Sequence, residues 1–109
     1  MDILELVRWM INAGAAVYGN STNDVWNSWL SLFNGAGSQF WINGISEAAG
    51  NPGAANPTGL IIGHMSGGAF YWYGDIVEVL IYDSNLSDAD KNQLGQYLAD
   101  RYGLIYTDI

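Results

Sequence analysis

Glu78 is a carboxylate inside an apolar stretch of this 109-residue sequence, between Ile76-Val77 and Val79-Leu80-Ile81. Hydrolysis by paired carboxylates needs two acids held across a groove, one of them with a raised pKa. No second acid stands two residues before or after Glu78. A buried carboxylate must instead be paired. We therefore predict a structural ion pair between Glu78 and Arg101, with Arg8 as the alternative partner, and we expect no enzymatic activity.

An aromatic run, Tyr71-Trp72-Tyr73, follows a glycine-rich loop that holds the sole histidine, His64. Flat aromatic faces together with hydrogen-bonding groups recognise sugars, so these four residues are the candidate ligand-binding residues. The alternative is that His64 is an ordinary loop residue and that alternate members of the run fill the core, because Trp72 points opposite to its neighbours in a strand. Three further tryptophans are expected in the core: Trp26, Trp29 and Trp41.

The C-terminal third of the chain supplies the elements that position Glu78 and Arg101. Asp75 to Asp83 has two mostly apolar faces, which is typical of a central strand in a two-layer sheet. Ser87 offers an N-cap, and carboxylates in the following turn oppose the positive end of the helix dipole. Gly103 stands where a helix ends in the left-handed conformation. The pattern predicts one α-helix over about residues 88–102, with a packing stripe formed by Leu94, Tyr97, Leu98, Arg101 and Tyr102.

The upstream residues predict short strands and turns. The Asn-Gly pair of Asn34 to Gly37 favours a hairpin with a type I′ turn, and Asn43-Gly44 offers a second turn. Ile45 to Thr58 is small and polar and contains both prolines, so it is interpreted as a surface loop. Ile3 to Asn12 fits the spacing of a helix as well as the alternation of a strand, and a strand from about Val7 is favoured. Further strands are predicted over Ala15 to Tyr18, Val25 to Phe33, Ser38 to Ile42 and Leu60 to Gly63.

Composition restricts the partners. The chain has 3 basic and 11 acidic residues and a net charge of −8, which argues against nucleic acid or an anionic membrane. There is no cysteine, hence no disulfide and no thiolate metal site. Met1 to Met10 lacks a basic n-region and is not a recognisable signal peptide, and no apolar run is long enough for membrane insertion. Residues 1–109 are expected to form a single domain.

The run from Gly74 to Leu104, GDIVEVLIYDSNLSDADKNQLGQYLADRYGL, resembles the C-terminal signature of the concanavalin A-like, laminin-G-like (LamG) jelly-roll family. The matching features are a G-[DN]-I-x-E strand, an L-[ST]-x-x-[DE] helix start and a Y-L-x-x-[KR]-Y-G end. Leu32 to Gly44 and Gly59 to Gly63 are similar to upstream segments of the family. The resemblance implies an all-β, antiparallel two-sheet β-sandwich with one C-terminal α-helix, truncated because the chain is short for this family.

The resemblance also implies a function. Such domains recur in bacterial surface proteins and in phage tail and capsid-surface proteins, so the leading expectation is a non-catalytic adhesion module, extracellular, at a cell surface or on a virion, with a carbohydrate ligand. The alternative is a purely structural or decoration-type subunit whose partner is a neighbouring protein subunit, including another copy of the chain, because the missing strands would leave an open sheet edge. No cofactor is assigned. The resemblance also makes calcium a candidate, because many laminin-G-like domains bind it at the sandwich rim through loop carboxylates and carbonyls. The rim candidates are Asn23, Asp24, Asp75 and Asp83.

Overall fold

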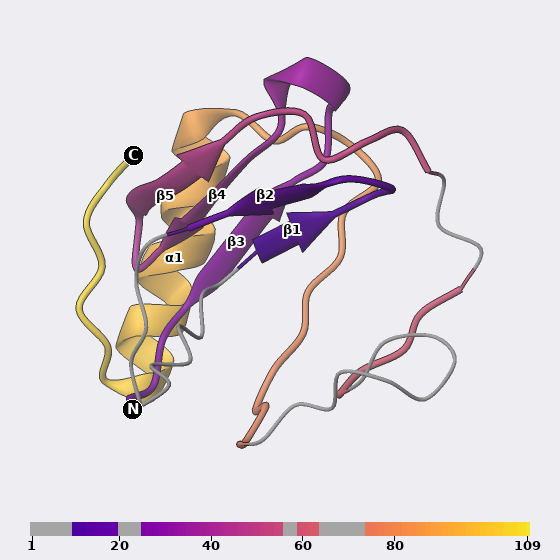
Figure 1. Ribbon diagram of the computed structural model, residues 1–109. Coiled ribbons are helices and arrows are strands. Elements are labelled where there is room, and N and C mark those ends of the chain that lie inside the picture. Colours follow the sequence, from indigo (N-terminus) through magenta and orange to yellow (C-terminus); the bar gives the residue numbers. More distant parts are fainter. Residues whose placement is uncertain (1–9, 20–24, 56–58, 64–73) are drawn as a thin grey trace, which may run out of the picture.

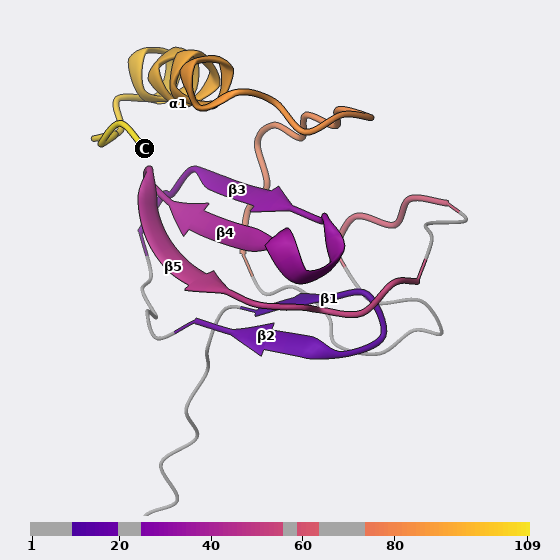
Figure 2. The same cartoon turned by 90° about the horizontal axis from the view of Figure 1, so that it is seen from above.

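Two antiparallel sheets and one helix form the described part of the chain (Figure 1). The computed structural model describes residues 10–19, 25–55, 59–63 and 74–109. Strands β1 (Met10–Asn12) and β2 (Ala16–Tyr18) form a hairpin, and β3 (Trp29–Leu32), β4 (Gln39–Ile42) and β5 (Ile45–Ala49) form a meander. Figure 2 shows the three-stranded sheet between the β1–β2 hairpin on one side and helix α1 (Asp88–Tyr102) on the other.

The β4–β5 turn is the two-residue loop Asn43-Gly44, as the sequence predicts. Asn43 has a φ of 54° and Gly44 a φ of 81°, which are the positive angles that a type I′ turn needs. The side chain of Asn43 also bonds the strand next to its own: its Oδ1 accepts from the backbone N–H of Ser28 at 2.9 Å, and its Nδ2 donates to Asn27 Oδ1 at 2.8 Å. The turn therefore fixes the start of β3 as well as the register of β4 and β5.

The β3–β4 hairpin is confirmed, but its predicted type I′ turn is wrong. Gly35–Gly37 forms a single turn of 3-10 helix, η1, and Asn34 has a φ of −147° instead of a positive value. The hydroxyl of Ser38 accepts from the N–H of Asn34 at 2.8 Å and donates to the carbonyl of Gly35 at 2.8 Å. The turn is longer than a two-residue loop because this buried hydroxyl closes it.

The core is split between the two faces of the three-stranded sheet. Phe40 is fully buried on the face toward the β1–β2 hairpin, where its ring stacks on Trp29 with centroids 4.9 Å apart. Trp41 is buried on the opposite face, under α1. Trp26 is exposed, which corrects its assignment to the core, because it lies in an irregular segment before β3 begins.

Helix α1 begins and ends as the sequence predicts. Ser87 Oγ accepts the backbone N–H of Asp90 at 3.1 Å, and Gly103 is left-handed with φ 67° and ψ 34°. Its buried residues, however, are Lys91, Gly95 and Ala99, whereas Tyr97 and Arg101 of the predicted stripe are exposed. The helix packs closely on the sheet through small residues and a lysine stem, so the bulky stripe is displaced toward one side.

The predicted jelly roll is found only in part. The described residues form two small antiparallel sheets with one C-terminal helix, and no closed sandwich is present among them. Two predicted strands, Asp75 to Asp83 and Leu60 to Gly63, are not strands, and the predicted loop from Ile45 instead begins with strand β5. Apolar alternation at 75–83 does not by itself place another strand within hydrogen-bonding distance. The tight Asn43-Gly44 turn, in contrast, places residues 45–49 directly beside β4.

Candidate functional site

The predicted ligand-binding residues His64, Tyr71, Trp72 and Tyr73 lie outside the described residues, as do two of the calcium candidates, Asn23 and Asp24. Asp75 and Asp83 are described, and both are exposed. Within the described ranges no three or more histidine, aspartate or glutamate side chains gather into a metal-binding group. The carbohydrate and calcium sites therefore stay predictions.

Glu78 and Arg101, the predicted ion pair, are brought together by the structure. Arg101 Nε lies 3.7 Å from Glu78 Oε2, with the Arg101 side chain 58% exposed and the Glu78 side chain 20% exposed. An exposed pair of this length contributes little stability because solvent screens it. In Figure 1 the segment before α1 leads into the first turn of the helix, and the helix then runs in the opposite direction.

Two tyrosines hold Glu78 more closely than the arginine does. Tyr97 Oη donates to Glu78 Oε1 at 3.0 Å, and Tyr102 Oη donates to Oε2. The hydrogen bond from Tyr102 lowers the pKa of Glu78 most, and Tyr97 and the charge of Arg101 lower it further. The same hydrogen bond raises the pKa of Tyr102. A carboxylate held ionised in this way is a poor proton donor near neutral pH, so the cluster is a structural tie.

Sequence reasoning identified the arginine and missed the tyrosines as partners. The sequence predicts Tyr97 and Tyr102 only as members of the packing stripe of the helix, although a buried tyrosine hydroxyl usually has a hydrogen-bond partner. The signal was the presence of two tyrosines on the helix face that also carries Arg101. Because Glu78 binds α1 and not a neighbouring strand, it attaches the segment 75–82 to the helix by a side chain.

The segment 75–82 is extended and largely exposed. Ile76, Leu80 and Tyr82 belong to one of two sets of apolar side chains that alternate in the sequence, and they are 46%, 43% and 51% exposed. The other set is Val77, Val79 and Ile81. These three side chains are 58%, 46% and 67% exposed. The segment therefore presents a row of β-branched apolar side chains that the described part of the chain does not cover.

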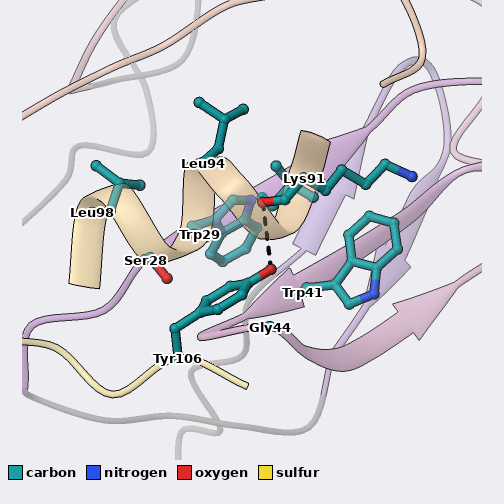
Figure 3. A pocket seen from close by; sticks show the side chains of 10 residues that line it. Ser28, Trp29, Trp41, Gly44, Lys91, Leu94, Leu98 and Tyr106 are labelled. Atoms are coloured by element: carbon teal, nitrogen blue, oxygen red, sulfur yellow. Dashed lines mark hydrogen bonds between the residues drawn. The ribbon is translucent and has the colours of Figure 1, made fainter. Parts of the chain in front are cut away.

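A small cavity lies between α1 and the sheet (Figure 3). Its volume of about 20 Å³ is enough for roughly one water molecule, which makes it a packing gap. The side chain of Lys91 is buried beside it, with Nζ 5.0 Å from the centroid of the Trp41 ring and 3.4 Å from Asp88 Oδ1. Tyr106 of the C-terminal tail closes the gap, and its hydroxyl donates to Asn92 Oδ1 at 3.0 Å.

Comparison of the chain with family models, with curated proteins and with solved structures gave no match. The laminin-G-like resemblance therefore stays a prediction. No helix in the described part of the chain combines the length and the apolar character that crossing a membrane requires. Among the described residues, the Glu78 cluster and the exposed segment that it holds are the features on which the proposed function rests.

Proposed function

We propose that this chain is a non-catalytic module that assembles with another protein chain, and that the segment 75–82 is its docking surface. The observation that carries the proposal is the exposed row of Val77, Val79 and Ile81 in an extended segment. Exposed apolar rows of this kind mark surfaces for association. The three side chains are already about half buried, so covering the rest of them would contribute on the order of 3–5 kcal/mol, since full burial of one valine or isoleucine contributes roughly 1.5–3 kcal/mol.

The backbone of the same segment favours strand addition. Among the described residues, no backbone–backbone hydrogen bond involves residues 75–82. An extended segment with unpaired N–H and C=O groups pairs readily with a strand of another chain, whose main chain supplies affinity and whose alternate side chains supply specificity. Glu78 bonds two tyrosines of α1 and so holds the segment at the helix, while Val77, Val79 and Ile81 stay exposed for the partner.

Charge indicates the chemistry of the partner. The chain carries a net charge of −8, and the segment begins and ends at the carboxylates Asp75 and Asp83. Two copies of the chain would repel one another at this surface, whereas an apolar strand flanked by lysine or arginine would be attracted. We therefore assign the surface to a partner with a basic-flanked apolar strand. The virion or cell-surface setting expected from the family resemblance is compatible with such an assembly role.

The experiment measures binding of a synthetic peptide with eight alternating valine and threonine residues flanked by lysine pairs. We expect the parent chain to bind it, with slower amide hydrogen exchange at residues 75–82, and to bind the glutamate-flanked version at least about tenfold more weakly. Val79→Lys should abolish binding. Val25→Lys is the matched control, because Val25 is 69% exposed outside the segment and should leave binding unchanged.

Three results would overturn the proposal. Equal binding by the parent and by Val79→Lys would show that the segment is not part of the interface. Absence of peptide binding would show that the chain does not associate by strand addition. A concentration-dependent dimer in light scattering, lost in Val79→Lys, would replace the basic partner with a second copy of the chain.

A further inference from the structure

We propose that a groove on the outer side of α1 is a binding site for a neutral sugar of one or two rings. The groove lies where the segment entering the helix passes its first turns, has a volume of about 450 Å³ and is lined by six residues. The groove is open to solvent on one side, so it would hold a small ligand against the helix without enclosing it. The lining residues are Tyr82, Leu86, Asp90, Gln93, Leu94 and Tyr97.

The helix places these groups on one face. Asp90, Gln93 and Tyr97 follow one another at spacings of three and four residues, which is one side of an α-helix. Leu94 belongs to the same face and contributes an apolar surface together with Leu86. Tyr82 comes from the extended segment, which Glu78 holds against the helix four residues earlier.

The two aromatic rings are available and partly fixed. Tyr82 and Tyr97 are both exposed. Tyr97 is held by its hydroxyl, which donates to Glu78 at 3.0 Å, and by Arg101, whose guanidinium carbon lies 6.0 Å from the ring centroid. A ring that is already positioned loses little conformational freedom when a ligand packs against it. The C–H faces of a sugar ring are apolar and suit such a platform.

The polar groups suit hydroxyls better than charges. Gln93 is exposed and offers an amide that both donates and accepts. Asp90 Oδ2 accepts from the hydroxyl of Ser87 at 2.7 Å, and its carboxylate lies in the first turn of α1, where the helix dipole offsets its charge. A cationic ligand would therefore gain little from this acid, and an anionic ligand would meet a chain with a net charge of −8.

This site is distinct from the proposed protein-docking surface. Tyr82 lines the groove beside α1, whereas Val77, Val79 and Ile81 are not among the residues that line it. The two proposals consequently fail independently. Val79→Lys should lose binding of the strand peptide and keep binding of the sugar.

The test is a titration of the ¹⁵N-labelled chain with methyl glucoside, methyl galactoside, cellobiose and lactose, followed by amide chemical shifts. We expect at least one of these sugars to shift the amides of Gln93, Leu94 and Tyr97 in a saturable manner. Gln93→Ala and Tyr82→Ala should each weaken binding at least about fivefold. Gln96→Ala is the matched control on the same helix, because Gln96 bonds Asp108 at 3.3 Å instead of lining the groove.

Folding of each variant is checked by its thermal melt before its affinity is compared. Unchanged affinity in folded Gln93→Ala and Tyr82→Ala would overturn the site, and so would the absence of saturable shifts with all four sugars. Tighter binding of tetramethylammonium than of any of the sugars would overturn the ligand class, since the aromatic pair would then serve a cation.

Discussion

Gly95 of α1 and Tyr106 of the C-terminal tail approach so closely that a Cβ atom at position 95 would lie 2.1 Å from carbons of the tyrosine ring. The tail follows the helix back and is bonded at several points. Thr107 donates its N–H to the carbonyl of Asn43 at 2.9 Å, and Ile109 donates its N–H to Asn92 Oδ1 at 2.7 Å. The glycine lets the tail, the helix and the β4–β5 turn meet.

Gly95→Ala should destabilise the chain by about 1–3 kcal/mol, because the added methyl group forces the Tyr106 ring out of its position. In a Tyr106→Ala background the same change should stabilise it by about 0.5–1 kcal/mol, since alanine is the better helix former. Chemical denaturation of the four chains measures both values. If Gly95→Ala changes the free energy of unfolding in the same direction with and without the tyrosine ring, the close approach is not the reason for the glycine.

Asn43→Ala should destabilise the chain by about 1–3 kcal/mol, since it removes the bonds to Ser28 and Asn27 and leaves a non-glycine residue at φ 54°. Asn43→Gly should be milder than Asn43→Ala, because glycine loses the same bonds but tolerates the positive angle. The exposed Asn34→Ala, at φ −147°, is the matched control and should lie within about 0.5 kcal/mol of the parent. An alanine variant as stable as the glycine variant would contradict the backbone part of this explanation.

Glu78 should make stability depend on pH. Its pKa is lowered in the folded chain, first by the hydrogen bond from Tyr102, so its contribution is present above the ordinary glutamate pKa and is lost as the pH falls through the lowered value. Glu78→Gln should therefore melt below the parent at about pH 7, and the difference should shrink as the pH falls through the lowered pKa. The exposed Asp83→Asn serves as the control on the same segment.

The relative size of the effects that lower the pKa of Glu78 can be tested by substituting its partners. Tyr102→Phe should raise the pKa of Glu78 more than Arg101→Gln does, because the tyrosine hydrogen bond lowers that pKa most and the exposed guanidinium least. The measurement is an NMR titration of the Glu78 carboxyl carbon. A larger rise in Arg101→Gln would make the ion pair, and not the tyrosines, the main tie between the segment and α1.

Local signals in the sequence predicted the local structures. The helix limits follow from Ser87 and Gly103, and the β4–β5 turn follows from Asn43-Gly44. The pairing of Glu78 with Arg101 was also accessible, since an acid in an apolar run requires a partner and basic residues are few. The helix limits and the turn depend on residues that act within one turn of the backbone. The ion pair was predictable because the chain has only three basic residues that could pair with Glu78.

The sequence by itself therefore determined the two ends of α1 and the Asn43-Gly44 turn, because these depend on backbone angles that Ser, Asn and Gly control within a few residues. The tertiary structure decided which apolar stretches find a partner. Residues 45–49 became a strand because a tight turn places them beside β4, while the stronger apolar pattern at 75–82 stayed unpaired and is tied to α1 through Glu78. Alternation marks the faces of an extended segment, but only long-range packing supplies the neighbouring strand that turns it into a sheet.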